Sequence, residues 1–233
     1  MKVVALANLG THDLVHKDGT YPPLNQVEGL LDRPSLWDDY SIPIITPFLK
    51  AVKKKSGKPP VLIIFVTWQD ESPGVLHAKD TLYLGHLVSK WLGPGGRPDL
   101  TGRAEKVVLS PPAPKEPHNH DAMFNWYEAV LPGCIREALG GRAIKLSDLP
   151  QLHISVTAGT PAMNMALLFR SFSLGLGRVE GVWHVDEGQQ KALPLQVGHV
   201  LAGEPLRQTL KAHMVRGDWE GAAEMARYLR PAY

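Results

Sequence analysis

The segment from His153 to Phe169 constrains the fold more than any other part of the chain. It reads as a buried strand that ends at Val156, a tight turn of small residues, and a helix that begins at Pro161. Proline suits the first position of a helix because its φ is fixed near the helical value and its missing N–H would be unpaired there, and Thr160 before it suits an N-cap. This order of elements predicts an α/β fold in which a helix N-terminus lies over the end of a strand.

Apolar strands and helix-length segments alternate along most of the chain. Strands are expected at residues 3–8, 61–67, 106–110, 152–157 and 181–185. Helices are expected at residues 42–55, 75–92, 121–139 and 161–174. Near-continuous apolar strands separated by helices are typical of a parallel sheet covered on both faces, because parallel neighbours need a crossover connection. The sequence therefore predicts a Rossmann-like, doubly wound α/β fold with a mainly parallel sheet.

The pattern changes after Val185. Residues 191–197 are expected to form an edge strand or a hairpin arm. Two helices are then expected, at residues 205–215 and 218–229, joined around Gly217. We therefore expect one domain at residues 1–203 and a short C-terminal helical appendage at residues 204–233.

Composition and charge exclude several classes of protein. No run approaches the roughly 18 apolar residues that a membrane helix needs, and Gly10 interrupts the N-terminus too early for a signal peptide. A single cysteine, Cys134, rules out an internal disulfide framework and indicates a reducing compartment. The net charge of +2 is too small for a basic face that binds duplex nucleic acid. We expect a cytoplasmic protein, without membrane or duplex nucleic acid as a partner, whose charge suits a small anionic ligand.

Three loops of polar or small residues follow strand ends, starting at Asn8, Thr67 and Thr157. Parallel strands would bring all three loops to one edge of the sheet, where doubly wound folds bind ligands. The unpaired N–H groups and the dipole of the helix that begins at Pro161 attract anions, and Gly159 would let a ligand approach the backbone closely. We predict phosphate recognition. The expected ligand contacts are Asn8, Gly10, Thr11, His12, Asp13, Thr67, Trp68, Gln69, Thr157, Ala158, Gly159, Thr160, Pro161 and Asn164.

Other readings of these and neighbouring residues stay open. Trp68 could stack on adenine or pack within the protein, and Asn164 could contact a base or ribose or be a satisfied core amide. His118 and His120 have a spacing that two metal ligands can use, but no third and fourth ligand is evident, so we expect a polar loop and no metal site. No Gly-x-Gly-x-x-Gly follows the first strand and no nucleophile elbow is visible, so we expect no dinucleotide cofactor and no serine-hydrolase chemistry.

Two runs, Thr157-Ala-Gly-Thr-Pro-Ala-Met-Asn164 and Asn8-Leu-Gly-Thr-His-Asp13, each follow an apolar strand. With them the chain resembles the CRISPR-associated Rossmann-fold (CARF) domains, which sense cyclic oligoadenylates in type III CRISPR defence. The run Asp218-Trp-Glu-Gly-Ala-Ala223 is similar to the start of the helical linker after this domain in the Csm/Csx effector ribonucleases. The resemblance implies a sensor domain at residues 1–203, with residues 204–233 as an appendage or the start of a linker to an effector domain that is not in this sequence.

The resemblance also implies a function. A homodimer would bind one ring of cyclic tetra- or hexa-adenylate in a two-fold symmetric groove and control an effector domain, since repeating AMP units match an isologous dimer. An alternative is a metal-independent ring nuclease, in which a 2′-hydroxyl of the ligand attacks its adjacent phosphate and Thr11 and His12 are the catalytic residues. An alternative of another class is a nucleotide-sensing transcriptional regulator, although no segment after residue 204 resembles a winged-helix DNA-binding element.

Overall fold

The computed structural model describes residues 1–23, 27–68, 80–100, 102–114, 116–142, 149–196, 212–221 and 223. By its contacts the chain divides into a first unit, Met1–Pro194, and a second unit, Leu195–Tyr233. The domain boundary that we expected at residues 203 and 204 lies outside the described residues. None of the described helices is long and apolar enough to cross a membrane.

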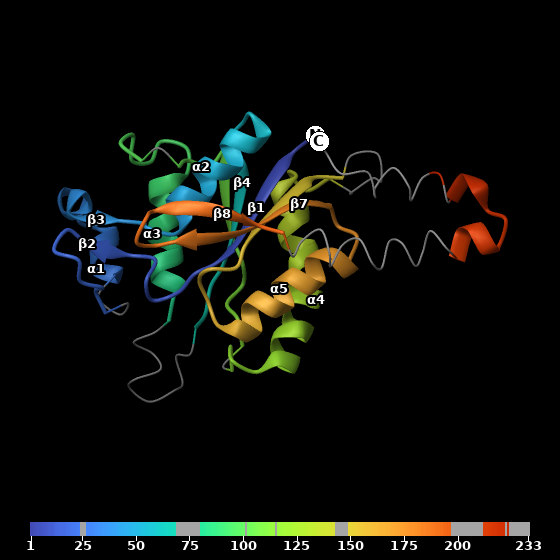
Figure 1. Ribbon diagram of the computed structural model, residues 1–233. Helices are drawn as coiled ribbons and strands as arrows, with labels where there is room; N and C mark the ends of the chain where they lie inside the picture. Colours follow the sequence, from blue (N-terminus) through green and yellow to red (C-terminus); the bar gives the residue numbers. More distant parts are fainter. Residues whose placement is uncertain are drawn as a thin grey trace. The chain divides into compact units, whose positions relative to one another are not determined.

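A six-stranded sheet with the order β5-β4-β1-β6-β7-β8 runs through the molecule (Figure 1). Its strands are β1 (Val3–Asn8), β4 (Val61–Phe65), β5 (Lys106–Leu109), β6 (Gln151–Ser155), β7 (Arg178–Asp186) and β8 (Lys191–Leu195). Four neighbouring pairs are parallel: β1 with β4, β1 with β6, β4 with β5, and β6 with β7. In the centre, Leu6 pairs with Ile63 on one side and with Ile154 on the other. The connection at residues 187–190 is too short for a parallel crossover, so β8 closes a hairpin with β7.

The order of the strands reverses at the centre of the sheet. From β1 the chain moves outward through β4 to β5, and it then returns to the opposite side of β1 with β6. The carboxyl ends of β1 and β6 therefore flank a topological switch point, the usual ligand-binding position in doubly wound sheets. The predicted Rossmann-like, mainly parallel α/β fold is confirmed.

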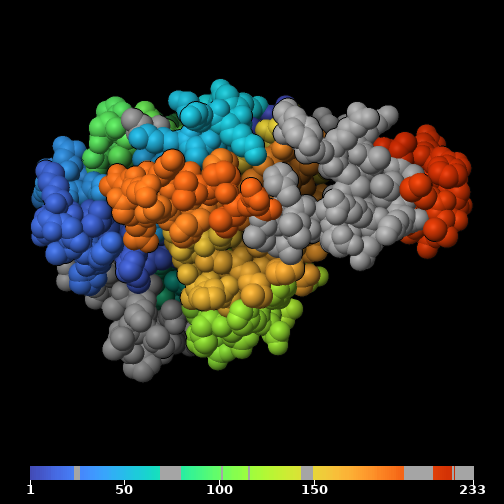
Figure 2. All heavy atoms as spheres, viewed as in Figure 1, coloured from blue at the N-terminus to red at the C-terminus, as the bar shows by residue number. Residues whose placement is uncertain are grey.

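Helices cover both faces of the sheet, which explains why the central strands are apolar throughout. Val3, Ala5 and Ala7 of β1 pack in the core beneath α2 (Ile45–Ser56) and α3 (Leu82–Leu92). Val4 and Leu6 point to the other face, beneath α4 (His120–Ala138) and α5 (Pro161–Ser173). Burial of each such Val or Leu side chain contributes roughly 1.5–3 kcal/mol. On the surface, the β7–β8 hairpin (orange), α5 (gold) and α4 (green) lie on the face shown in Figure 2.

An insertion between β1 and α2 was not predicted. It consists of β2 (Val15–His16), α1 (Glu28–Leu31), the 3-10 helix η2 (Pro34–Asp39) and β3 (Tyr40–Ser41), and β2 pairs with β3 in a separate two-stranded sheet. Each of these elements is too short to produce a periodic apolar pattern.

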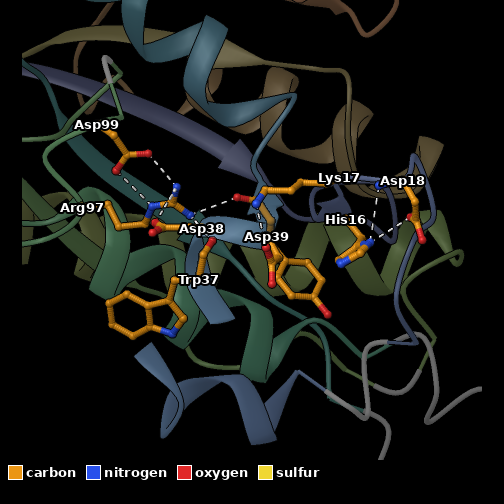
Figure 3. A network of polar contacts seen from close by, with 9 residues as sticks. His16, Lys17, Asp18, Trp37, Asp38, Asp39, Arg97 and Asp99 are labelled. Atoms are coloured by element: carbon orange, nitrogen blue, oxygen red, sulfur yellow. Dashed lines mark hydrogen bonds and ion pairs between the residues drawn. The ribbon is translucent and has the colours of Figure 1, made fainter. Parts of the chain in front are cut away.

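Polar contacts hold this insertion against the loop after α3 (Figure 3). The side chain of Arg97 is only 9% exposed and donates hydrogen bonds to the carbonyls of Trp37 and Tyr40. It also forms a bidentate pair with Asp99, at 3.1 and 2.6 Å. A buried guanidinium needs such partners, because an unpaired buried charge is strongly destabilising.

Most predicted elements are confirmed with small changes at their ends, but the helix predicted at residues 75–92 begins late. Helix α3 starts at Leu82, and Thr81 before it is not helical, while residues 75–79 lie outside the described part. The hydroxyl of Thr81 accepts a hydrogen bond from the N–H of Thr67 (2.9 Å), and the N–H of Thr81 donates to the carbonyl of Thr67 (3.2 Å). These bonds compete with a helical conformation at Thr81.

In the second unit, residues 212–215 and 219–221 are helical; most of the rest of the two helices predicted at residues 205–215 and 218–229 falls outside the described residues. Asp218 caps the second of these segments, because its Oδ1 accepts a hydrogen bond from the N–H of Gly221 (2.9 Å). Its Oδ2 lies 2.7 Å from Nδ1 of His213.

Candidate ligand-binding site

A cavity of about 390 Å³ lies at the carboxyl edge of the sheet. This volume lies toward the lower end of the roughly 300–1,000 Å³ typical of small-molecule sites. The wall comes from the loops after β1, β4 and β6, the start of α2, the segment before α4, the first turn of α5 and the turn after β7. Its residues are Leu9, Gly10, Thr11, His12, Ile44, Thr67, Thr81, Pro117, His118, Thr157, Ala158, Gly159, Thr160, Met163 and Glu187.

The turn after β6 brings main-chain donors to this cavity. Thr160 is the N-cap of α5, and its Oγ1 accepts a hydrogen bond from the N–H of Met163 (3.2 Å) and donates one to the carbonyl of Pro117. Among the described residues, the N–H groups of Gly159, Thr160 and Ala162 donate no hydrogen bond. Free N–H groups at the positive end of a helix dipole attract anions, which is the basis of the phosphate recognition that the sequence predicts.

Gly159 lines the cavity, as its predicted role in close ligand approach requires, and the lack of a side chain at this position also matters within the protein. Its φ is +84°, and a Cβ at this position would lie 2.6 Å from the Cβ of Asn8. A Cβ on Gly10 would in turn lie 3.1 Å from the N of Gly159. The two glycines let the loops after β1 and β6 approach each other, so a larger residue at Gly159 would push against β1.

The side chains of Thr157 and Ala158, just before Gly159, also contact other parts of the protein. The Oγ1 of Thr157 accepts a hydrogen bond from the N–H of Val185 at the end of β7 (2.7 Å). Ala158 is buried and belongs to the core beneath α2 and α3. Both border the cavity, whereas Pro161 does not line it. The turn after β6 therefore faces the cavity mainly with its backbone.

The loop after β1 presents side chains. Thr11 and His12 are exposed and line the cavity. The imidazole of His12 stacks on Tyr21, with ring centroids 4.4 Å apart, and its Nδ1 lies 3.9 Å from an Oε of Glu187. The ring and the carboxylate together limit the orientations of this imidazole.

Asp13 is fully buried below the loop and does not line the cavity. The N–H of Gly10 donates to its Oδ2 at 2.7 Å, and its Oδ1 has no hydrogen-bond partner among the described residues. Burial raises the pKa of the Asp13 carboxyl to about 8, with a further contribution from the charge of Glu187. The carboxyl is therefore mostly protonated at neutral pH and holds the loop in place.

Asn8 and Asn164 form a hydrogen-bonded chain behind the cavity. The hydroxyl of Tyr127 donates to Oδ1 of Asn8, and Nδ2 of Asn8 donates to Oδ1 of Asn164 (2.9 Å). Burial raises the pKa of Tyr127 well above its usual range, so the phenol remains a donor. Of the two readings of Asn164, the structure shows the hydrogen-bonded amide, and neither asparagine lines the cavity.

The loop after β4 contributes Thr67, which is buried and lines the cavity. The ring of Trp68 packs edge-on against Tyr83, with centroids 5.5 Å apart, and Trp68 does not line the cavity. Gln69 lies outside the described residues.

The predicted ligand contacts lack three polar residues of the site, Thr81, His118 and Glu187. Thr81 fell within a predicted helix, His118 was assigned to a polar loop, and Glu187 was not considered. Glu187 directly follows β7, so its position at the carboxyl edge was a usable signal. No Lys or Arg is found among the described lining residues, and the described part of the chain contains no group of three or more His, Cys, Asp or Glu side chains that could hold a metal ion.

Comparison with known proteins gives a similarity in fold. The sequence matches no protein-family model and none of the curated proteins compared with it. A structure of Csm6 from Enterococcus italicus, bound to cyclic hexa-2′-fluoro-hexa-dAMP, is similar with a TM-score of 0.51 and 11% sequence identity. The match covers 99% of this chain and 49% of that chain, so this chain spans about half the length of that protein. The similarity supports the Rossmann-like fold of the chain.

Proposed function

We propose that this chain is a sensor that binds a cyclic oligoadenylate, as the resemblance to CARF domains implies. One observation carries the proposal: the loops after β1 and β6 enclose a cavity at the topological switch point, where the N-terminus of α5 offers free main-chain donors. The ligand bound by the similar Csm6 structure belongs to the same chemical class.

The lining of the cavity suits a phosphate group. This group would sit at the N-terminus of α5, close to Gly159 and Thr160. Leu9, Ile44 and Met163 also line the cavity, but they are only 1–2% exposed and offer a base little surface.

The size of the cavity supports a homodimer. A volume of about 390 Å³ lies near the lower limit for small-molecule sites and is small for a ring of four or six nucleotides. A second copy, related by a two-fold axis, would supply an equivalent cavity to the other half of the ring. Binding would then favour one arrangement of the dimer and pass the signal through residues 204–233 to an effector domain in the cytoplasm.

Calorimetric titration of the chain with cyclic tetra-adenylate and cyclic hexa-adenylate tests the proposal. We expect one ring to bind per two chains, with the chain dimeric by light scattering at micromolar concentration. Mass spectrometry of the bound nucleotide identifies the preferred ring. Absence of binding to both rings would remove the sensor proposal, and one ring bound per monomer would remove the symmetric groove.

A second candidate function is cleavage of the ring, favoured by the contacts of His12 with Tyr21 and Glu187 at the wall of the cavity. A 2′-hydroxyl of the ligand would attack its adjacent phosphate, with Thr11 and His12 aligning the groups or stabilising the developing charge. A Thr11→Ala/His12→Ala double variant would slow turnover by orders of magnitude while changing affinity much less. Turnover in the presence of EDTA tests whether the reaction is metal-independent.

A further inference from the structure

Glu187 places a carboxylate in a cavity whose other features attract anions. Its side chain is 38% exposed, lines the cavity and lies in the turn after β7. Within the described lining there is no Lys or Arg to balance this charge, and the nearest cationic candidate, His12, is 3.9 Å away. A phosphate close to Glu187 would be repelled. A phosphate would therefore sit at the N-terminus of α5, and a different part of the ligand must face Glu187.

The other carboxyl near the cavity does not share this role. Asp13 is buried, and its Oδ2 already accepts a hydrogen bond from Gly10. Burial raises the pKa of Asp13 to about 8, so this group carries little charge at neutral pH. Glu187 is the one acidic side chain among the described lining residues, and a charged carboxylate can only accept hydrogen bonds.

We propose that Glu187 is a specificity-determining residue that accepts a hydrogen bond from a donor group of the bound nucleotide. The inference rests on the proposed binding of a cyclic oligoadenylate. Such a ring has two kinds of donor, the 2′-hydroxyl of the ribose and the amino group of adenine, while its phosphodiesters offer only acceptors. A hydrogen bond to a charged group is stronger than one between neutral groups, so the loss of the donor has a measurable effect on affinity.

Three rings distinguish the two donors. Cyclic hexa-adenylate carries both, its 2′-fluoro analogue lacks the hydroxyl, and the corresponding ring of purine riboside, with hydrogen in place of the amino group, lacks the amino donor and gains no other. We expect wild type to bind the adenylate ring about tenfold or more tightly than one of the two analogues, and the identity of that analogue names the donor. Glu187→Ala should bind the adenylate ring about tenfold more weakly and lose the preference. Glu187→Gln, which keeps one acceptor oxygen, should be intermediate.

Two variants serve as controls, with folding of all variants checked by circular dichroism. Glu105→Ala removes the same charge just before β5, at the opposite edge of the sheet, and should behave as wild type. His12→Ala should lower affinity but keep the preference, because the preference belongs to the carboxylate. Equal affinities of Glu187→Ala and wild type for the adenylate ring, or an equal loss for all three rings, would overturn the role of Glu187 and leave the sensor proposal intact. Failure of wild type to bind any ring would overturn both.

Discussion

The two loops that meet at the switch point contribute to the cavity in opposite ways. After β6, the side chains of Thr157 and Thr160 are bonded within the protein and Gly159 packs against β1, so the turn faces the cavity with main-chain N–H groups. After β1, the buried Asp13 fixes the backbone, and the side chains of Thr11 and His12 face the cavity. Substitutions in the turn after β6 should therefore act through stability, and substitutions of exposed residues after β1 through binding.

The largest effect on stability is expected for Gly159→Val. The valine would adopt an unfavourable φ of +84° and place its Cβ 2.6 Å from that of Asn8, so the free energy of unfolding should fall by about 3 kcal/mol or more. Urea unfolding measures this change.

Gly57→Val is the matched control, because Gly57 has a φ of +78° but no atom within 4 Å of the added Cβ. It carries the backbone strain alone and should lose only about 1–2 kcal/mol. Equal losses for the two variants would show that the contact with Asn8 is unimportant.

Asp13→Asn tests the buried side of the β1 loop and should change the pH dependence of stability. The pKa of Asp13 is raised in the folded protein to about 8, whereas the unfolded chain loses this proton near pH 4. The contribution of Asp13 is thus fully present below about pH 4 and is lost as the pH rises towards 8. The variant, which has no proton to lose, should gain stability relative to wild type between pH 4.5 and 8.5, on the order of a few kcal/mol.

Denaturant titrations of both proteins at these two pH values give the difference directly. Comparison at each pH removes the contributions of groups that titrate in both proteins. A difference in unfolding free energy that is the same at both pH values would contradict the protonated state of Asp13.

Thr160→Ala should have a smaller effect. The variant loses the side-chain cap of α5 and the hydrogen bond to the carbonyl of Pro117, which together should lower the free energy of unfolding by about 1 kcal/mol. Thermal unfolding detects a change of this size. Asn119→Ala removes the corresponding cap of α4, where Asn119 accepts from the N–H of Ala122 at 3.1 Å, and serves as the comparison. No loss in Thr160→Ala together with a loss in Asn119→Ala would show that α5 does not depend on its cap.

The smallest effect on stability is expected for Thr11→Ala and His12→Ala. Both side chains are exposed, so each substitution should change the free energy of unfolding by less than about 0.5 kcal/mol. The same variants should weaken binding of the preferred ring about tenfold, since the loss of one hydrogen bond to the ligand has this size. A loss of stability without a loss of affinity would reverse the roles assigned to the two loops.

Local chemistry accounts for the parts of the fold that the sequence predicted. The apolar strands β1 and β4, and the order of small residues, Pro161 and helix after β6, determine structure within a few residues. The insertion after β1 escaped prediction because it depends on distant side-chain to backbone contacts, such as those of Arg97 with Trp37. The sequence placed the candidate site at the carboxyl edge of the sheet, where the structure has a cavity. It did not predict the burial of Asp13, because burial follows from tertiary packing.

The helix N-terminus at the cavity has a consequence for chemical modification. Thr160, the N-cap of α5, lines the cavity, so the positive end of the α5 dipole lies at its wall. Peptide groups produce this dipole, and the described lining contains no lysine. Acetylation of the lysines of this protein would change its net charge yet leave the attraction for an anion at this helix end in place, because that attraction is a property of the folded backbone.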